Sequence, residues 1–182
     1  MQKQIIVIIG GPGTGKTTII DGLKERGYCC YPEISREVTL EARKQGIEQL
    51  FLENPLLFSE LLLEGRKKQF RNACEESHDM IFLDRGIPDV LAYMHYIGDS
   101  YPAFFDGACR EHVYTKIFIL PPWEAIYTSD EARYENFEQA KLIYGHLVET
   151  YRNYGYELIE VPCADVNSRI DFILENIGRQ TA

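Results

Sequence analysis

The amino-acid sequence predicts an α/β fold in which a five-stranded parallel sheet lies between two layers of helices. Short apolar segments, several of them rich in β-branched residues, alternate along the chain with segments of helical periodicity. Glycine or proline follows most of the apolar segments and ends them. Strands that alternate with helices form parallel sheets, because the chain has to cross back over the sheet before the next strand begins.

Five segments are expected to form the strands. Each is a short apolar run that is bounded by a residue unsuited to the interior of a strand. The expected strands are Gln4–Ile9, Tyr28–Tyr31, Met80–Leu83, Lys116–Leu120 and Glu157–Val161.

Helices are expected in the intervals between these strands. One spans Lys16–Arg26 and ends at Gly27, and Pro55 opens a longer helix that reaches about Cys74. The other helices are expected at 34–45, at 89–97, between 98 and 115, from about 134 to 154, and from 166 to 177, the last capped by Asp165.

The helix expected to begin near Tyr134 has the clearest apolar pattern. Its apolar residues recur at alternating steps of three and four, which places them on one face of about six helical turns. They are Phe137, Ala140, Tyr144, Leu147, Tyr151 and Tyr154, followed by Gly155. We expect this stripe, and the leucine-rich stretch Leu56–Leu63, to face the core, although the latter would also suit the wall of a substrate pocket.

Length and charge limit the functions that this chain can have. At about 150 residues per domain, 182 residues favour a single domain over residues 1–182. The net charge of −9 makes the chain a poor binder of nucleic-acid polymers, because neutralising phosphates needs a basic face. The first thirty residues nevertheless hold four basic residues against two acidic ones. A small positive patch in an acidic protein suits a small anionic ligand.

The cysteines, histidines and apolar segments favour a cytoplasmic protein without a membrane span. The five cysteines lack C-x-x-C spacing, so we expect reduced thiols, and the four histidines lack the spacing of a zinc site. The apolar run Ile5–Ile9 is too short to cross a membrane. It continues into glycines and a lysine, unlike a signal peptide.

The strongest motif follows the first expected strand. Residues Gly10 to Thr17 read GGPGTGKT and match G-x-x-x-x-G-K-[ST] between a strand and a helix, which predicts a P-loop NTPase fold. Glycines allow backbone N–H groups to point at phosphate oxygens, and the helix adds its positive N-terminal end. The expected contacts to ATP or GTP are Gly10, Gly11, Pro12, Gly13, Thr14, Gly15, Lys16, Thr17 and Thr18. The Rossmann pattern G-x-G-x-x-G is not matched, which disfavours a dinucleotide-binding oxidoreductase.

Two residues of this motif are expected to act on the phosphates and on a metal ion. Lys16 would reach the β- and γ-phosphates, and its side chain is expected to be exposed when no nucleotide is bound. Thr17 would offer its hydroxyl group to Mg²⁺.

A second motif, Asp84-Arg85, follows the third expected strand. An acidic residue at the tip of an apolar strand is placed to hold Mg²⁺, here through water, and the adjacent Arg85 would clamp a phosphoryl group. A helix cap at Asp84 and a surface Arg85 are the alternative. ATPases that act as motors usually place a glutamate after this aspartate, so the arginine favours transfer to a bound acceptor over hydrolysis.

A third group of polar residues, Glu33 and Arg36, follows the second expected strand. A carboxylate at this edge would accept the proton of an attacking hydroxyl group, and Arg36 would hold that carboxylate or bind the substrate. The alternative is ordinary helix-start chemistry, because acidic residues favour the first turn of a helix.

The segment from about 121 to 135 lies where small P-loop kinases carry a lid. Arg133 is its only basic residue, so it is the lid's candidate for neutralising charge during transfer, with a solvated surface arginine as the alternative. Trp123 would stack on a base or pyridine ring of the acceptor, or it would anchor the lid on the next helix.

Taken together, GGPGTGKT, PEISREV, FLDRGIPD and the segment Pro121–Ala140 resemble the small P-loop proteins grouped as AAA-type ATPase-like domains. They resemble more loosely the ribosylnicotinamide kinase domain, which has a tryptophan near the position of Trp123, and the deoxynucleoside and thymidylate kinases. The first resemblance covers nearly the whole chain and implies ATP or GTP binding and a kinase-like α/β fold.

The looser resemblance to kinases implies roles for single residues. Asp84 and Arg85 match the Asp-Arg pair after the third strand of these kinases, and Glu33 matches the carboxylate after the second. The chain departs from them at Gly86, where deoxynucleoside kinases usually have serine, and its lid lacks their cluster of arginines.

The sequence therefore predicts a Mg²⁺-dependent phosphotransferase that moves the γ-phosphoryl group of ATP to a small nucleoside- or nucleotide-like acceptor. The alternative is an ATP- or GTP-binding NTPase or switch that acts through a protein partner. The oligomeric state and the identity of the acceptor are left open. Catalytic roles are expected for Lys16, Glu33, Asp84, Arg85 and Arg133, acceptor binding for Glu33, Arg36, Arg85 and Trp123, and Mg²⁺ binding for Thr17 and Asp84.

Overall fold

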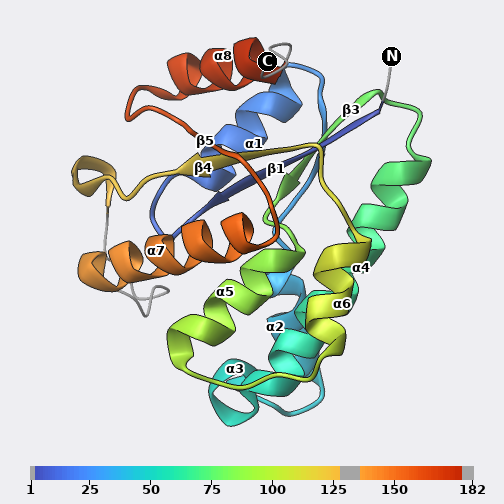
Figure 1. The fold of residues 1–182 in the computed structure, drawn as a ribbon. Coiled ribbons are helices and arrows are strands. Elements are labelled where there is room, and N and C mark those ends of the chain that lie inside the picture. Colours follow the sequence, from blue (N-terminus) through green and yellow to red (C-terminus); the bar gives the residue numbers. More distant parts are fainter. Residues whose placement is uncertain (1–2, 128–135, 178–182) are drawn as a thin grey trace.

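A computed structural model of the chain describes residues 3–127 and 136–177. Its five strands form one parallel sheet in the order β2-β3-β1-β4-β5, which confirms the predicted α/β fold (Figure 1). The strands are β1 (Gln4–Gly10), β2 (Cys29–Tyr31), β3 (Met80–Asp84), β4 (Lys116–Leu120) and β5 (Leu158–Glu160). β1 lies at the centre, which explains why its apolar run has no alternating pattern: helices cover both of its faces.

Eight helices are found in the described residues. They are α1 (Lys16–Glu25), α2 (Ser35–Lys44), α3 (Leu50–Glu53), α4 (Pro55–Glu75), α5 (Ile87–Ile97), α6 (Phe104–Glu111), α7 (Phe137–Asn153) and α8 (Val166–Ile177), with a 3₁₀ turn at Glu124–Ile126. Six of them were expected within a few residues of these bounds, and α6 was expected as a helix between β3 and β4 without bounds of its own. The helix α3 was not expected, because its four residues are too few to show a helical period.

Two apolar cores, one on each side of the sheet, hold these layers together. Ile6 and Ile8 of β1 pack with α1 and α8, whereas Ile5, Val7 and Ile9 belong to the core with α4, α5, α6 and α7. Figure 1 shows these two groups of helices on opposite sides of the sheet. Successive side chains of a strand point to opposite faces, so one run of isoleucines and a valine supplies both cores.

Helix α7 begins later than the sequence pattern suggests. Asn136 caps it: the Asn136 side chain accepts a hydrogen bond from the backbone of Gln139 at 2.9 Å, and the Gln139 side chain accepts one from the backbone of Asn136 at 2.8 Å. The expected start near Tyr134 lies outside the described residues. With 17 residues the helix has about five turns rather than six. Its buried face includes Ile143, whereas the neighbouring Tyr144, expected on that face, is only half-buried.

The carboxyl ends of β1, β2 and β3 lie at the same edge of the sheet, because the strands are parallel. Ile8 of β1 is in register with Asp84 of β3, and Leu83 of β3 is in register with Tyr31 of β2. The segments that follow these three strands therefore meet above this edge.

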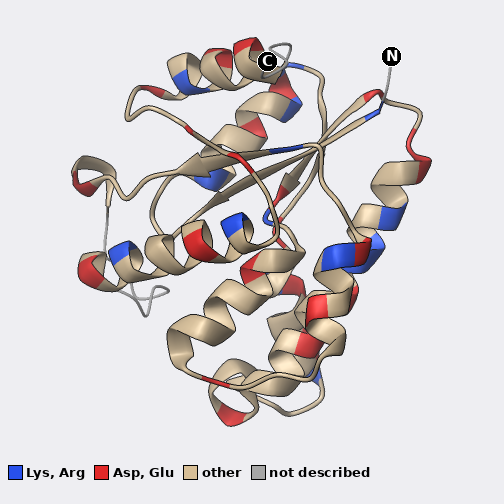
Figure 2. Ribbon diagram, in the orientation of Figure 1, with Lys and Arg blue, Asp and Glu red and all other residues tan. Residues whose placement is uncertain are grey.

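Charge is kept out of the sheet interior (Figure 2). The charged residues within the strands, Asp84, Lys116 and Glu160, all stand at strand ends, and most acidic and basic residues lie on the helices and loops. Within residues 3–127 and 136–177, no helix combines the length and the apolar character needed to cross a membrane.

Replacing Leu147 of α7 by alanine is expected to lower the free energy of unfolding by about 2–5 kcal/mol, because a buried leucine leaves a cavity. The matched control is Leu142→Ala on the same helix, where 60% exposure predicts a change of about 0.5 kcal/mol or less. Urea denaturation measures both values. Similar losses for the two variants would contradict the assignment of the buried face.

Candidate functional site

The loop Gly10–Gly15 is packed so tightly that several of its positions require glycine. Gly13 and Gly15 have φ angles of +75° and +85°, which side chains rarely permit. A Cβ atom on Gly11 would lie 3.0 Å from the carbonyl oxygen of Ala140 in α7. The Thr14 hydroxyl group donates a hydrogen bond to the Gly11 carbonyl at 2.9 Å and closes the loop on itself.

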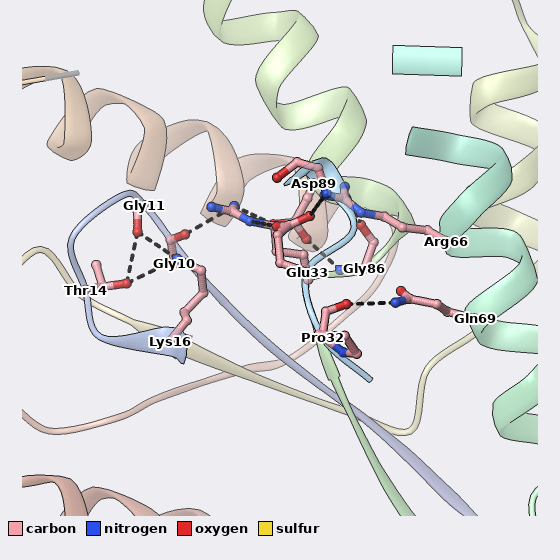
Figure 3. A network of polar contacts seen from close by, with 12 residues as sticks. Gly10, Gly11, Thr14, Lys16, Pro32, Glu33, Arg66, Gln69, Gly86 and Asp89 are labelled. Carbon is pink, nitrogen blue, oxygen red and sulfur yellow. Dashed lines mark hydrogen bonds and ion pairs between the residues drawn. The ribbon is translucent and has the colours of Figure 1, made fainter. Parts of the chain in front are cut away.

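Lys16 does not extend into solvent, contrary to our expectation. Its side chain is 8% exposed, and its Nζ donates to the Gly11 carbonyl at 2.9 Å and lies 3.4 Å from the Thr14 hydroxyl (Figure 3). Burial, together with the nearby Arg85 cation, lowers the pKa of Lys16 to about 7. Thr17 and Thr18, at the start of α1, are exposed.

Glu33, after β2, is held by two guanidinium groups. Its Oε2 forms an ion pair with Nε of Arg85. Its Oε1 lies 3.4 Å from a terminal nitrogen of the buried Arg66 in α4 (Figure 3). The backbone N–H of Ser35 also donates to Oε1 at 3.0 Å. Burial alone would raise the pKa of Glu33, but the two arginines lower it to about 2, so this carboxylate is ionised at neutral pH.

Arg85 reaches this position through an unusual backbone conformation. Its φ is +73°, the only positive φ among the non-glycine residues described, and its N–H still donates to the Ile8 carbonyl of β1 at 3.0 Å. From there Arg85 lies 3.4 Å from the Gly10 carbonyl and 3.3 Å from the carboxylate of Asp89. Such a conformation costs about 1–3 kcal/mol, which surrounding contacts must offset.

Asp89 in α5 supplies those contacts from a buried position. Its Oδ2 accepts hydrogen bonds from the Gly86 backbone at 2.9 Å and from the Tyr151 hydroxyl group of α7 at 2.6 Å, while Oδ1 faces Arg85. The buried Arg66 donates to the Gly86 carbonyl at 3.1 Å. Helices α4, α5 and α7 thus fix the Arg85–Glu33 pair.

Asp84 at the end of β3 is 4% exposed, and its Oδ1 has no hydrogen-bond partner among the described residues. Burial raises the pKa of Asp84, although the cations of Lys16 and Arg85 oppose this rise. Mg²⁺ prefers hard oxygen donors. The unpartnered carboxylate oxygen of Asp84 and the exposed hydroxyl group of Thr17 are donors of this type. The donor set therefore fits this metal ion.

A cavity of about 770 Å³ opens beside the ion pair. Its lining residues combine charge with aromatic surface and include Glu33, Arg36, Phe51, Phe58, Arg85 and Tyr93, and Pro12 of the loop also borders it. The structure therefore brings together Glu33, Arg36 and Arg85 as expected.

Two other expected residues are not part of this group. Trp123 does not line the cavity, and its ring instead lies 5.8 Å from the guanidinium carbon of Arg169 in α8. Arg133 and the rest of 128–135 lie outside the described residues.

The sequence reasoning missed Arg66, Asp89 and Tyr151. Asp89 had a local signal, because it stands four residues after Arg85 and three after Gly86, in the first turn of α5. Arg66 and Tyr151 had none: each reads as an ordinary helical residue until the helices are packed.

A family model described as an AAA domain matches residues 5–169. No curated protein sequence matches the chain. Among solved structures, deoxyadenosine kinase from M. mycoides with bound products is 19% identical, with a TM-score of 0.69 over 96% of this chain and 98% of that one. The NadR protein in complex with NR is 16% identical, with a TM-score of 0.77 over 99% of this chain and 53% of that one, so the chain spans about half of that protein.

Thymidylate kinase from Candida albicans is 15% identical, with a TM-score of 0.63 over 97% of this chain and 91% of that one. At these identities the likeness establishes the fold, which is that of a small P-loop, kinase-like NTPase. The fold resemblance seen in the sequence motifs is confirmed.

We expect Tyr151→Phe to lower the free energy of unfolding by about 1.5–3 kcal/mol, because it removes a buried hydrogen bond to a carboxylate. Tyr154→Phe, at the residue that follows α7, is the control. Its hydroxyl group donates to the partly exposed Asp106 at 2.7 Å, and a loss below about 1 kcal/mol is expected. Denaturant titration compares the two variants. Equal losses would show that the buried hydrogen bond to Asp89 contributes no more to stability than the hydrogen bond to Asp106.

Proposed function

The chain belongs to the AAA domain family, and on this premise we propose that it is a single-domain, ATP-dependent phosphotransferase. It would move the γ-phosphoryl group of ATP to a hydroxyl group of a small nucleoside- or nucleotide-like acceptor. The observation that carries this proposal is the cavity of about 770 Å³, which borders the glycine-rich loop at Pro12 and contains both Glu33 and Arg85. An acceptor in this cavity would lie beside the transferred group.

The lining of the cavity suits a flat ring that carries polar substituents. Phe51 and Phe58 lie with their ring centroids 6.2 Å apart, and with Tyr93 they offer an aromatic surface for stacking. Arg36 lines the cavity from α2 and is exposed, so it can meet an anionic group of the acceptor. A base held by the aromatic residues and an anion held by the arginine describe a nucleotide-like molecule.

In the proposed reaction the acceptor hydroxyl oxygen bonds to the γ-phosphorus, and the bond from that phosphorus to the β–γ bridging oxygen breaks. Glu33 accepts the hydrogen bond of the attacking hydroxyl group and orients it. With a pKa of about 2, Glu33 is a weak base and takes the proton only as the new bond forms, which a loose transition state permits. Arg85 neutralises charge on the transferred group, and Lys16 reaches the β- and γ-phosphates.

Mg²⁺ would be held by the Thr17 hydroxyl group and, through water, by Asp84. When bound, the ion neutralises charge on the phosphate oxygens. The protein contributes a carboxylate that is already desolvated and has an oxygen without a partner.

Labelled ATP incubated with a panel of nucleosides and nucleoside monophosphates tests the proposal. We expect one acceptor class to be phosphorylated and Glu33→Gln to lower that rate by about 10²–10⁴-fold, while background ATP hydrolysis changes less. Glu37→Gln, an exposed position on α2, is the matched control and should leave the rate unchanged. Hydrolysis without transfer to any acceptor would favour an NTPase or switch and contradict the proposal.

Nucleotide binding is expected to take up protons through Lys16. The pKa of this residue is about 7 in the free protein, and phosphate oxygens beside the ammonium group would raise it. Above pH 7, free protein with a neutral Lys16 would therefore gain a proton on binding, and affinity should fall as the pH rises. Titration calorimetry in buffers of different ionisation enthalpy measures this uptake.

Lys16→Arg is the control for proton uptake, because a guanidinium group stays protonated at this pH. It is expected to bind nucleotide without the uptake. Equal uptake by the wild type and by Lys16→Arg would assign the proton to another group.

A further inference from the structure

Arg169 of α8 is a buried cation beside the glycine-rich loop. The residue is 3% exposed, and one terminal nitrogen donates to the Thr14 carbonyl at 2.9 Å. A Cβ atom on Gly15 would lie 3.0 Å from the other terminal nitrogen, and the Trp123 ring lies 5.8 Å from the guanidinium carbon. The guanidinium group is therefore enclosed between the loop and Trp123.

This cation has no anionic partner among the residues that the structure describes. Among residues 3–127 and 136–177, no carboxylate lies within ion-pair distance of Arg169, and its buried Nε has no hydrogen-bond partner. Burial lowers the pKa of Arg169, which shows that its surroundings disfavour the charge. Buried charges in proteins are normally paired with an opposite charge. An unpaired buried cation beside a loop that binds anions therefore indicates that its counter-charge is a bound anion from outside the chain.

We propose that Arg169 is a positioning residue for the bound nucleotide, and that the polyphosphate is the anion that this buried cation lacks. It would hold the Thr14 carbonyl, and with it the loop, in place and add positive potential beneath the phosphates. This inference rests on the proposed function only in requiring that nucleotide binds at the loop. It requires neither an acceptor nor transfer.

Lys16 of the motif is also buried without an ion pair and is the residue expected to meet the phosphates directly, whereas the other cations near the loop differ from Arg169. Arg85 is paired with Glu33 and Asp89, and Arg66 is paired with Glu33. Arg26, which directly follows α1, contacts Asp171 and Asn167 of α8 on the surface, at 2.5 and 3.1 Å. Arg26 thus contacts α8 through side chains without a hydrogen bond to the loop, which makes it a matched control for Arg169.

Binding measurements with two ligands, a non-hydrolysable ATP analogue and AMP, test the inference. They are made on three variants, Arg169→Met, Arg169→Lys and Arg26→Met. For Arg169→Met we expect the Kd of the analogue to rise at least about tenfold and the Kd of AMP to rise less, because the lost attraction grows with phosphate charge. The KM for ATP should rise with kcat largely retained. Arg169→Lys keeps the charge and should recover part of the affinity, and Arg26→Met should bind as the wild type does.

Thermal melts separate positioning from a merely structural role. Removal of an unpaired buried charge should leave the Tm of nucleotide-free Arg169→Met near or above that of the wild type, while the rise in Tm on adding the analogue shrinks. An unchanged Kd in Arg169→Met, together with a lowered Tm, would overturn the inference. If Arg169→Met does not fold, the same result in Arg169→Lys would overturn it. A wild type that binds no nucleotide would instead overturn the proposed function.

Discussion

The ion pair between Glu33 and Arg85 is the contact on which the arrangement of the site depends. It joins the residues that follow β2 and β3, two neighbouring strands that would otherwise lead into separate helices. Removing one partner of a buried or half-buried ion pair leaves the other charge desolvated, at a cost of about 3–5 kcal/mol for a fully buried pair. The strained backbone of Arg85, the capping by Asp89 and the hydrogen bond from Tyr151 all serve to keep this pair in place.

Cations gather at this edge of a protein whose net charge is −9. Lys16, Arg66, Arg85 and Arg169 are buried or half-buried there, and the carboxylates of Glu33, Asp84 and Asp89 compensate only some of them. The low pKa of Lys16 has the same origin, because burial and the nearby Arg85 both disfavour its charge. A site in this condition gains free energy when an anion enters, which suits a polyphosphate ligand.

The same charges change the role that the sequence suggested for Glu33. A carboxylate after β2 reads as a general base, yet two arginines lower its pKa to about 2 and keep it ionised. Its chemistry is then that of an oriented hydrogen-bond acceptor, which agrees with a reaction that needs positioning more than deprotonation. The pairing also fixes the carboxylate in the wall of the cavity that Pro12 of the loop borders.

The sequence by itself determined the five strands, all but the shortest helix, the glycine-rich loop and the placement of Asp84-Arg85 at a strand end. These features depend on apolar periodicity and on glycine, proline and capping residues, whose effects act within a few residues of the chain. Only the tertiary structure decided that Lys16 is buried, that Trp123 lies against Arg169 and that Arg66 and Tyr151 support the ion pair. The partners of Arg66, Tyr151 and Arg169 stand 20 to 155 residues away, and nothing local to a helix specifies which distant group its side chain will meet. These partners are set by how the helices pack against the sheet, and that packing depends on burying both apolar cores at once.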